Sequence, residues 1–215
     1  MNCSAAILCN GLFPKEPYPL YLLEQAQRTV CCDGALQSYL AHFGEKRLPD
    51  AVVGDMDSLP EALQERFSSR VVRVVEQEYN DLVKAMRHVL EHFPEVTEIH
   101  ILGATGLRED HTVGNLGLLM EFPRLLPLGG RQVDMVSDYG TAFAVTDSCE
   151  LHVGEGRRVS LFSADNSLRI TSEGLHWPTD DVVFDAWWKA TLNRADTDVI
   201  RLTFSHPSSA LVILD

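Results

Sequence analysis

Two aspartates separated by one residue form the strongest chemical signal in this sequence. Asp55 and Asp57 lie in the segment Gly-Asp-Met-Asp-Ser, directly after a short apolar run. In a tight turn their carboxylates come close together, and two like charges about 4 Å apart repel by roughly 4 kcal/mol at an effective dielectric constant near 20. Mg²⁺ offsets this repulsion, because it prefers carboxylate, water and phosphate oxygens. The pattern predicts a magnesium site; the alternative is a solvated acidic turn that caps the next helix through Ser58.

Further polar residues follow other apolar runs in the same way. Asp33 and Gly34 come directly after residues 29–32, and Asp81 follows a polar segment that contains Gln77. Taken singly, Asp33-Gly34 is typical of a turn or a helix start, and Asp81 is typical of an acid in the first turn of a helix. Their repeated place after apolar runs favours a shared site with Asp55 and Asp57.

The segment Gly103-Ala-Thr-Gly-Leu-Arg-Glu-Asp-His111 combines glycines with a cation. Glycines let backbone amides approach phosphate oxygens, and Arg108 can bind a phosphate with two parallel hydrogen bonds. Thr105 lies between the glycines, and Asp110 and His111 open the next predicted helix. For His111 a structural and a functional role are equally open. The segment is not a Walker A motif, because no Gly-Lys-Ser/Thr ends it, and it is not a dinucleotide fingerprint.

These residues need elements that bring them together. Up to about residue 127, short apolar runs alternate with helical patterns, which indicates an α/β domain with a mostly parallel sheet flanked by helices. Ligands bind at the carboxyl ends of such strands, where the acids and glycines lie. A helix with Asn80 as its N-cap is predicted after the fourth strand from apolar residues at helical spacing. The predicted strands are Ala5–Cys9, Thr29–Cys32, Ala51–Val53, Val71–Val75 and Glu98–Leu102.

After the turn-rich segment Pro127-Leu-Gly-Gly130 the pattern changes to short alternating strands. We therefore predict an α/β catalytic domain over residues 1–128 and an all-β sandwich over residues 129–215. The strands predicted for the second domain are Gln132–Val136, Arg158–Phe162, Leu168–Thr171, Val199–Phe204 and Ala210–Leu214.

The composition limits the possible functions. A formal charge of −13 opposes nucleic-acid binding, because a phosphate backbone is held chiefly by Lys and Arg. No run approaches the roughly 20 apolar residues of a membrane helix, so no membrane partner is expected. The five cysteines are odd in number and lack the CxxC spacing of zinc sites. They are expected to be reduced core residues of a cytoplasmic protein.

At these positions the sequence resembles the thiamine pyrophosphokinase family. The matching blocks are Asp33-Gly34, GDMDS, EQEYNDLVKAM and GATGLREDH with the following Asn115, in the order of the family. A looser match, GLHW and a segment ending Thr191-Leu-Asn193, corresponds to the thiamine-binding part. The sequence departs from the family at Glu76, Glu78, Leu107 and Leu192, where the family usually has Asp, Asp, Gly and Ser.

The resemblance implies an enzyme that transfers the diphosphate of ATP to the hydroxyl of thiamine with Mg²⁺ as cofactor. It implies a homodimer with active sites built between subunits. The implied catalytic residues are Asp55, Asp57, Asp81, Arg108 and Asp110, the first three of them as metal ligands. The implied ATP-binding residues are Asp33, Gly34, Ser58, Gln77, Gly103, Thr105, Arg108 and His111, and those for thiamine are Trp177, Thr191 and Asn193.

Two other functions stay open. The first keeps the diphosphate transfer but changes the acceptor to another heterocyclic alcohol, such as a hydroxymethyl pterin. The second is a noncatalytic sensor of nucleotide or thiamine, against which the intact acids and Arg108 argue.

Overall fold

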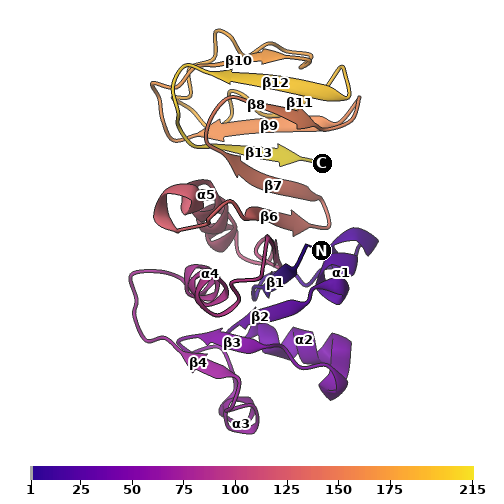
Figure 1. Cartoon of the computed structure of the whole chain (residues 1–215), viewed down its shortest axis with the longest axis vertical. Coiled ribbons are helices and arrows are strands. Elements are labelled where there is room, and N and C mark those ends of the chain that lie inside the picture. Colours follow the sequence, from indigo (N-terminus) through magenta and orange to yellow (C-terminus); the bar gives the residue numbers. More distant parts are fainter. Residues whose placement is uncertain (1) are drawn as a thin grey trace. The chain divides into compact units, whose positions relative to one another are not determined.

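The computed structural model describes residues 2–215, which form two compact units (Figure 1). The first unit contains the chain up to Asn115 together with Leu126–Asp138. The second contains Leu116–Leu125 and Tyr139–Asp215. Helix α5 (Glu109–Leu125) contributes residues to both units. Each unit has its own core.

The first unit is built on a parallel sheet with the strand order β6-β5-β1-β2-β3-β4. Every pair in this order is parallel, so the carboxyl ends of the six strands lie at one edge. The strands are β1 (Ser4–Leu8), β2 (Arg28–Cys32), β3 (Ala51–Gly54), β4 (Val71–Arg73), β5 (Glu98–Leu102) and β6 (Gln132–Ser137).

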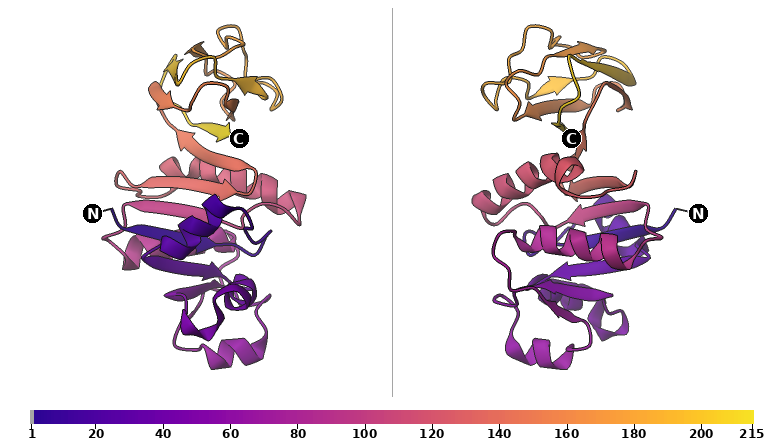
Figure 2. Two further views of the ribbon diagram at one scale, coloured as in Figure 1. Left: turned by 90° about the vertical axis from the view of Figure 1, so that its right-hand side faces the viewer. Right: turned by 60° about the vertical axis from the view of Figure 1, so that its left-hand side comes forward.

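Helices cover both faces of this sheet, as Figure 2 shows for α1 on one side and α4 on the other. One apolar cluster joins α1 and α2 to strand residues such as Ala6, Cys31 and Val52. Helix α4 begins after Asn80, whose Oδ1 accepts the backbone N–H of Val83 at 3.3 Å, as predicted for its N-cap. The helices of this unit are α1 (Pro17–Gln25), α2 (Ala35–Phe43), the 3₁₀ turn η1 (Gly44–Lys46), α3 (Glu61–Arg66) and α4 (Asp81–His92).

The strands of the second unit pair antiparallel in two groups, with the orders β11-β9-β13-β7 and β10-β12-β8. Side chains of both sheets, among them Leu161, Ile200 and Val212, share one core, as in a sandwich. In β12 the burial alternates residue by residue, which is the period expected for a strand with one buried face. The strands are β7 (Gly140–Val145), β8 (Cys149–His152), β9 (Arg158–Ser163), β10 (Ile170–Glu173), β11 (Asn193–Arg194), β12 (Val199–Phe204) and β13 (Ala210–Leu214).

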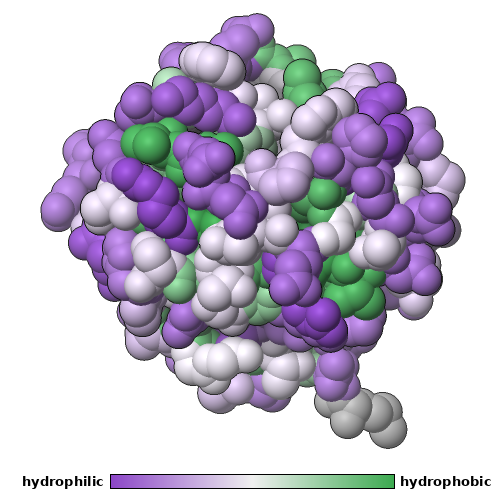
Figure 3. Space-filling view, turned by 90° about the horizontal axis from the view of Figure 1, so that it is seen from above, coloured by the Kyte–Doolittle hydropathy of each residue, from purple (hydrophilic) through white to green (hydrophobic). Residues whose placement is uncertain are grey.

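The expected fold class, an α/β domain followed by an antiparallel β domain, is confirmed. The assignment of Gln132–Val136 to the second half is wrong, because this strand pairs in parallel with β5 in the first unit. The domain boundary between residues 128 and 129 stays a prediction. Within the described part of the chain, no helix combines the length and the apolar character needed to cross a bilayer. The face in Figure 3 is mostly hydrophilic, with apolar residues in separate areas.

Candidate active site

Three carboxylates from separate elements meet at the carboxyl edge of the parallel sheet. Asp33 follows β2, Asp55 follows β3, and Asp81 is the first residue of α4. One oxygen from each lies within 4.8 Å of the others, the only such group of potential metal ligands among residues 2–215. Gly54 makes this approach possible: a Cβ there would lie 2.9 Å from Asp33 Cβ and 3.1 Å from Asp81 Cγ. We refer to Asp33, Asp55 and Asp81 as the acid triad.

Asp33 is the most buried member of the acid triad, with 4% of its surface exposed. Its Oδ2 accepts the backbone N–H of Ser58 at 2.9 Å, while its buried Oδ1 has no hydrogen-bond partner. Burial, followed by the charges of Asp81 and Asp55, raises the pKa of Asp33, although the Ser58 hydrogen bond opposes the rise. An ionised, unpartnered oxygen in this place is stabilised by a cation.

The pKa of Asp55 is shifted in the direction opposite to that of Asp33. Asp55 Oδ1 accepts the backbone N–H of Asp57 at 3.1 Å, and its Oδ2 accepts the Gln77 Nε2 at 3.2 Å. These hydrogen bonds lower the pKa of Asp55, with a smaller contribution from the charge of Lys84. The side chain of Asp57 is exposed and does not belong to the acid triad. Metal ligation by Asp57 therefore stays a prediction, and Asp33, which the sequence analysis placed with the nucleotide, occupies the triad instead.

Lys84 is a member of the site that the sequence analysis missed. Its side chain is 2% exposed, and its Nζ lies 3.2 Å from Asp81 Oδ1. A buried ammonium group requires such a partner, and here it offsets part of the negative charge of the acid triad. The available signal was its spacing, because a Lys three residues after Asp81 lies on the same face of α4.

The acid triad opens into a cavity of about 390 Å³. The loop after β5 also lines the cavity, and in this loop Gly103, Gly106 and Leu107 have φ angles of 61°, 75° and 66°. This loop is tied to the loop after β1, because Gly11 N–H donates to Gly103 O at 2.8 Å. A Cβ at Gly11 would lie 2.4 Å from that oxygen, so only glycine fits there.

Two asparagines connect the glycine-rich loop to the start of α4. Asn80 Nδ2 donates to Asn115 Oδ1 at 2.9 Å, and Asn115 Nδ2 donates to Ala104 O at 2.7 Å. Asn115 is 6% exposed, so both ends of its amide are used in the interior. Through these bonds α4, α5 and the loop after β5 hold one another at the rim of the cavity.

The other predicted residues of the first unit lie around this cavity, with some exceptions. Arg108 lines it, and its Nε donates to Asp110 Oδ1 at 3.1 Å. This ion pair raises the pKa of Arg108 and lowers that of Asp110. The predicted residues that line the cavity are Asp33, Asp55, Ser58, Gln77, Asp81, Gly103, Arg108 and His111; those that do not are Gly34, Asp57, Thr105 and Asp110.

The residues predicted to bind thiamine lie together in the second unit. Asn193 is 5% exposed, its Oδ1 accepts Trp177 N–H at 3.1 Å, and its Nδ2 donates to Trp177 O at 2.7 Å. The Trp177 side chain is 57% exposed. Thr191 Oγ1 donates to Trp188 O at 2.7 Å. Asn193 thus holds the backbone that presents the Trp177 ring.

Comparison with known proteins matches both units. Residues 20–125 match the family model described as "Thiamin pyrophosphokinase, catalytic domain", and residues 140–212 match "Thiamin pyrophosphokinase, substrate-binding domain". The chain is 25% identical to Thiamine pyrophosphokinase 1 of Oryza sativa subsp. japonica over 93% of this chain and 83% of that protein.

Solved structures agree in fold. Thiamin pyrophosphokinase from Candida albicans has a TM-score of 0.78 at 17% identity, covering 99% of this chain and 88% of that one. The yeast Thiamin Pyrophosphokinase has a TM-score of 0.80 at 15% identity, covering 99% and 86%. At such identities the likeness shows the fold alone. The two family matches, however, together span most of the chain, which therefore belongs to the thiamin pyrophosphokinase family.

Proposed function

We propose that this member of the family transfers the terminal diphosphate of ATP to the hydroxyl of thiamine, giving thiamine diphosphate and AMP. The observation that carries the proposal is that the acid triad, a glycine-rich loop and Arg108 line one cavity. This arrangement suits a polyphosphate, since such a transfer depends on positioning and on neutralising charge more than on covalent chemistry.

The acid triad fits Mg²⁺ as the cofactor. Asp33, Asp55 and Asp81 would hold the ion, and the unpartnered Oδ1 of Asp33 is a free acceptor of the kind that a cation satisfies. When bound there, Mg²⁺ supplies positive charge against the phosphate oxygens. Asp57 remains a proposed further ligand, because its turn lies next to Asp55. The lysine at position 84 leaves the triad with a net charge that one divalent ion neutralises.

Residues of the chain provide the remaining contacts to ATP. Arg108 lines the cavity and can exchange its exposed partner Asp110 for a phosphate, because both side chains are about two-thirds exposed. We assign Asp110 to orienting the Arg108 guanidinium, and Ser58, Gln77 and His111 to the walls that contact the nucleotide. Gly34 and Thr105 contribute through the loops that shape the cavity. The Gly106 amide already donates to Thr112 Oγ1 at 3.2 Å, so Gly103 is the stronger candidate for a phosphate contact.

Thiamine is a cationic aromatic molecule, and we assign its binding to the second unit. The exposed ring of Trp177 offers a face for such a cation, and its backbone is fixed by Asn193. Thr191 holds the neighbouring turn through Trp188. We further propose a homodimer in the cytoplasm, in accord with the resemblance to the family.

The test is to incubate the purified protein with ATP, Mg²⁺ and thiamine and to separate the products. AMP and thiamine diphosphate in equal amounts support the proposal, whereas ADP and thiamine monophosphate contradict it. No consumption of ATP would favour a sensor, and consumption only with a hydroxymethyl pterin would favour the other acceptor. Asp55→Asn should lower turnover by about 100-fold or more while circular dichroism stays unchanged, and wild-type activity in this variant would contradict the metal assignment.

A further inference from the structure

Two thiols, Cys9 and Cys32, lie next to each other in the wall of the cavity. Their Sγ atoms are 3.9 Å apart, and the two residues are only 7% and 3% exposed. Cys9 directly follows β1, and Cys32 ends β2. These strands are parallel neighbours in which Leu8 is paired with Cys31, so the next residues, Cys9 and Cys32, stand at one level.

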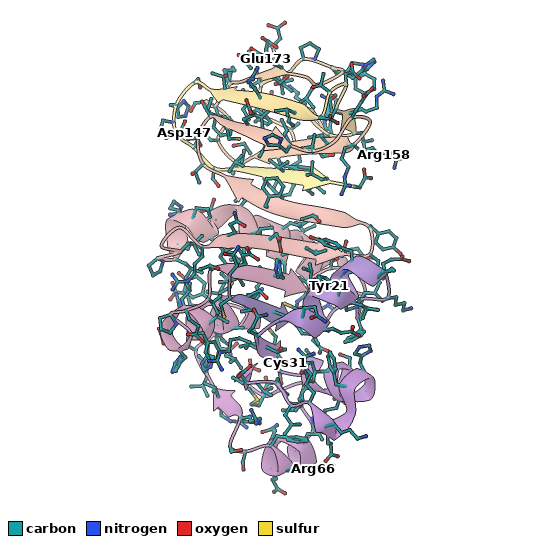
Figure 4. The ribbon with its side chains drawn as sticks, turned by 45° about the vertical axis from the view of Figure 1, so that its right-hand side comes forward. Tyr21, Cys31, Arg66, Asp147, Arg158 and Glu173 are labelled. Carbon is teal, nitrogen blue, oxygen red and sulfur yellow. The ribbon has the colours of Figure 1, made fainter. Side chains whose placement is uncertain are left out.

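The backbone at this level suits a disulfide. Neighbouring strands lie about 4.8 Å apart, and bridged cysteines have Cα atoms about 4.4 to 6.8 Å apart. The sulfur atoms, 3.9 Å apart in the reduced protein, need to approach to about 2 Å for the bond to form. Cys31 belongs instead to the core cluster that contains Leu36 and Tyr39. Figure 4 labels Cys31 among the side chains of the first unit.

A hydrogen bond and a peptide bond link the thiol pair to the acid triad. Cys32 Sγ donates to the backbone oxygen of Asp81 at 3.6 Å, and Cys32 immediately precedes Asp33. A bond to Cys9 removes the S–H and with it the hydrogen bond to the first residue of α4. Formation of the bond would therefore act on two members of the acid triad, Asp33 through the chain and Asp81 through the lost hydrogen bond.

We propose that Cys9 and Cys32 are a modification site, a dithiol that a peroxide converts into a disulfide and that thereby inactivates the enzyme reversibly. One sulfur attacks the peroxide, the O–O bond breaks, and a sulfenic acid and water form. The second sulfur attacks the sulfenic sulfur, the S–S bond forms, and a second water leaves. In total, two thiols lose two protons and two electrons, and hydrogen peroxide becomes two water molecules. The loss of activity rests on the proposed function; formation of the bond does not.

The bond itself is tested on the wild-type protein by mass spectrometry. Reduced protein is treated with hydrogen peroxide, its free thiols are alkylated, and it is digested without reduction. The expected result is a peptide pair joined through Cys9 and Cys32, lighter by two hydrogen atoms and separated again by dithiothreitol. ATP with Mg²⁺ should slow its formation, because they fill the cavity. Recovery of both residues in alkylated form, or linked only to other cysteines, would overturn the proposal.

Activity is tested with Cys9→Ser and the matched control Cys149→Ser, each compared with its own untreated sample. Cys149 lies in the second unit, away from the thiol pair in sequence. Peroxide should lower turnover of wild type and Cys149→Ser by about 100-fold, the effect of a displacement near 1 Å, and dithiothreitol should restore it. Treatment with peroxide should leave the turnover of Cys9→Ser at the value of its own untreated sample. If Cys9→Ser does not fold, Cys32→Ser is used in its place. Equal inactivation of the Cys9 or Cys32 variant would overturn the regulatory role. Failure of the proposed function would show separately, as absence of product before oxidation.

Discussion

Gly54 occupies a position where a side chain would separate the members of the acid triad. A Cβ there would meet both Asp33 and Asp81 at 2.9 to 3.1 Å. We expect Gly54→Ala to lower turnover by about 100-fold and to raise the Mg²⁺ concentration needed for half-maximal activity, because the carboxylates must move apart. Steady-state kinetics at varied Mg²⁺ measure both effects.

Gly114→Ala is the matched control for this change. It lies in α5, and an added Cβ would meet no atom within 4 Å. This variant should keep wild-type kinetics and gain about 0.5 to 1 kcal/mol of unfolding free energy, because alanine favours the helix. Unchanged kinetics in Gly54→Ala would show that the acid triad does not need its present spacing.

Lys84 places a positive charge beside the acid triad. Its removal should lower the free energy of unfolding most when no metal is bound. Lys84→Met keeps the apolar stem but leaves Asp81 unpaired and the three carboxylates repelling one another. We expect the metal-free protein to lose about 1 to 3 kcal/mol of unfolding free energy, and added Mg²⁺ to reduce this difference. Urea denaturation with and without Mg²⁺ measures it.

Lys189→Met is the control, because it breaks an ion pair with Asp185 whose side chains are 31% and 51% exposed. An exposed pair of this kind contributes about 0 to 1 kcal/mol, and Mg²⁺ should not change that value. A Lys84→Met variant as stable as the Lys189→Met variant would contradict the assigned role of Lys84.

The candidate site was predictable to the extent that its residues follow strands. Asp55 and Asp81 were found from this rule, and the structure brings them together. The place of Asp33 in the triad was missed, because it depends on burial and on a left-handed backbone with φ of 43° that the sequence does not display. Lys84 is not found by the search for helical periodicity, because that pattern is defined by apolar residues alone.

At the scale of elements, β5, β12 and β13 have the predicted bounds. The placement of β6 was wrong because alternation within a strand does not reveal whether its partner runs parallel or antiparallel. Strands β7, β8 and β11 were not predicted. The last of these has two residues, and β8 has four half-buried or exposed ones, so neither carries enough of a pattern.

The pairing of β6 with β5 places a pH-sensitive contact in the sheet. His100 and Asp134 are register partners, and His100 Nδ1 lies 2.8 Å from Asp134 Oδ1. Burial lowers the pKa of His100, but the hydrogen bond and charge of Asp134, with a contribution from Glu98, outweigh it, and the pKa is raised above 6.5. The imidazolium therefore stabilises the native state fully below pH 6.5, and this contribution is lost as the pH rises through the higher folded pKa.

We expect Asp134→Asn to destabilise the protein by about 1 kcal/mol more at pH 6 than at pH 9. Urea denaturation of the variant and the wild type at both pH values measures the difference. Asp180→Asn removes the same charge at an exposed position of the second unit and controls for net charge. A loss that is equal at both pH values would mean that the His100–Asp134 pair contributes nothing through protonation.

At the scale of the whole molecule, the two units have separate cores and match separate domain models of one family, one described as catalytic and one as substrate-binding. The acid triad, the glycine-rich loop and Arg108 belong entirely to the first unit. Trp177, Thr191 and Asn193 belong entirely to the second. Variants in the two units should therefore affect the two substrates differently.

Trp177→Ala tests this division of labour. The indole ring is 57% exposed and its backbone is held by Asn193, so its removal should leave the fold of the second unit intact. We expect the KM for thiamine to rise by about 10-fold, as for the loss of one cation–π contact, while the KM for ATP stays within about twofold. Trp188→Ala is the matched control, since that ring is 73% exposed and lies in the same unit. If the KM for thiamine rises only in Trp188→Ala, the aromatic contact is assigned to Trp188 instead. Equal rises of the KM for thiamine and the KM for ATP in Trp177→Ala would instead assign Trp177 to packing. The reason is that loss of a residue that contacts thiamine alone does not weaken the binding of ATP.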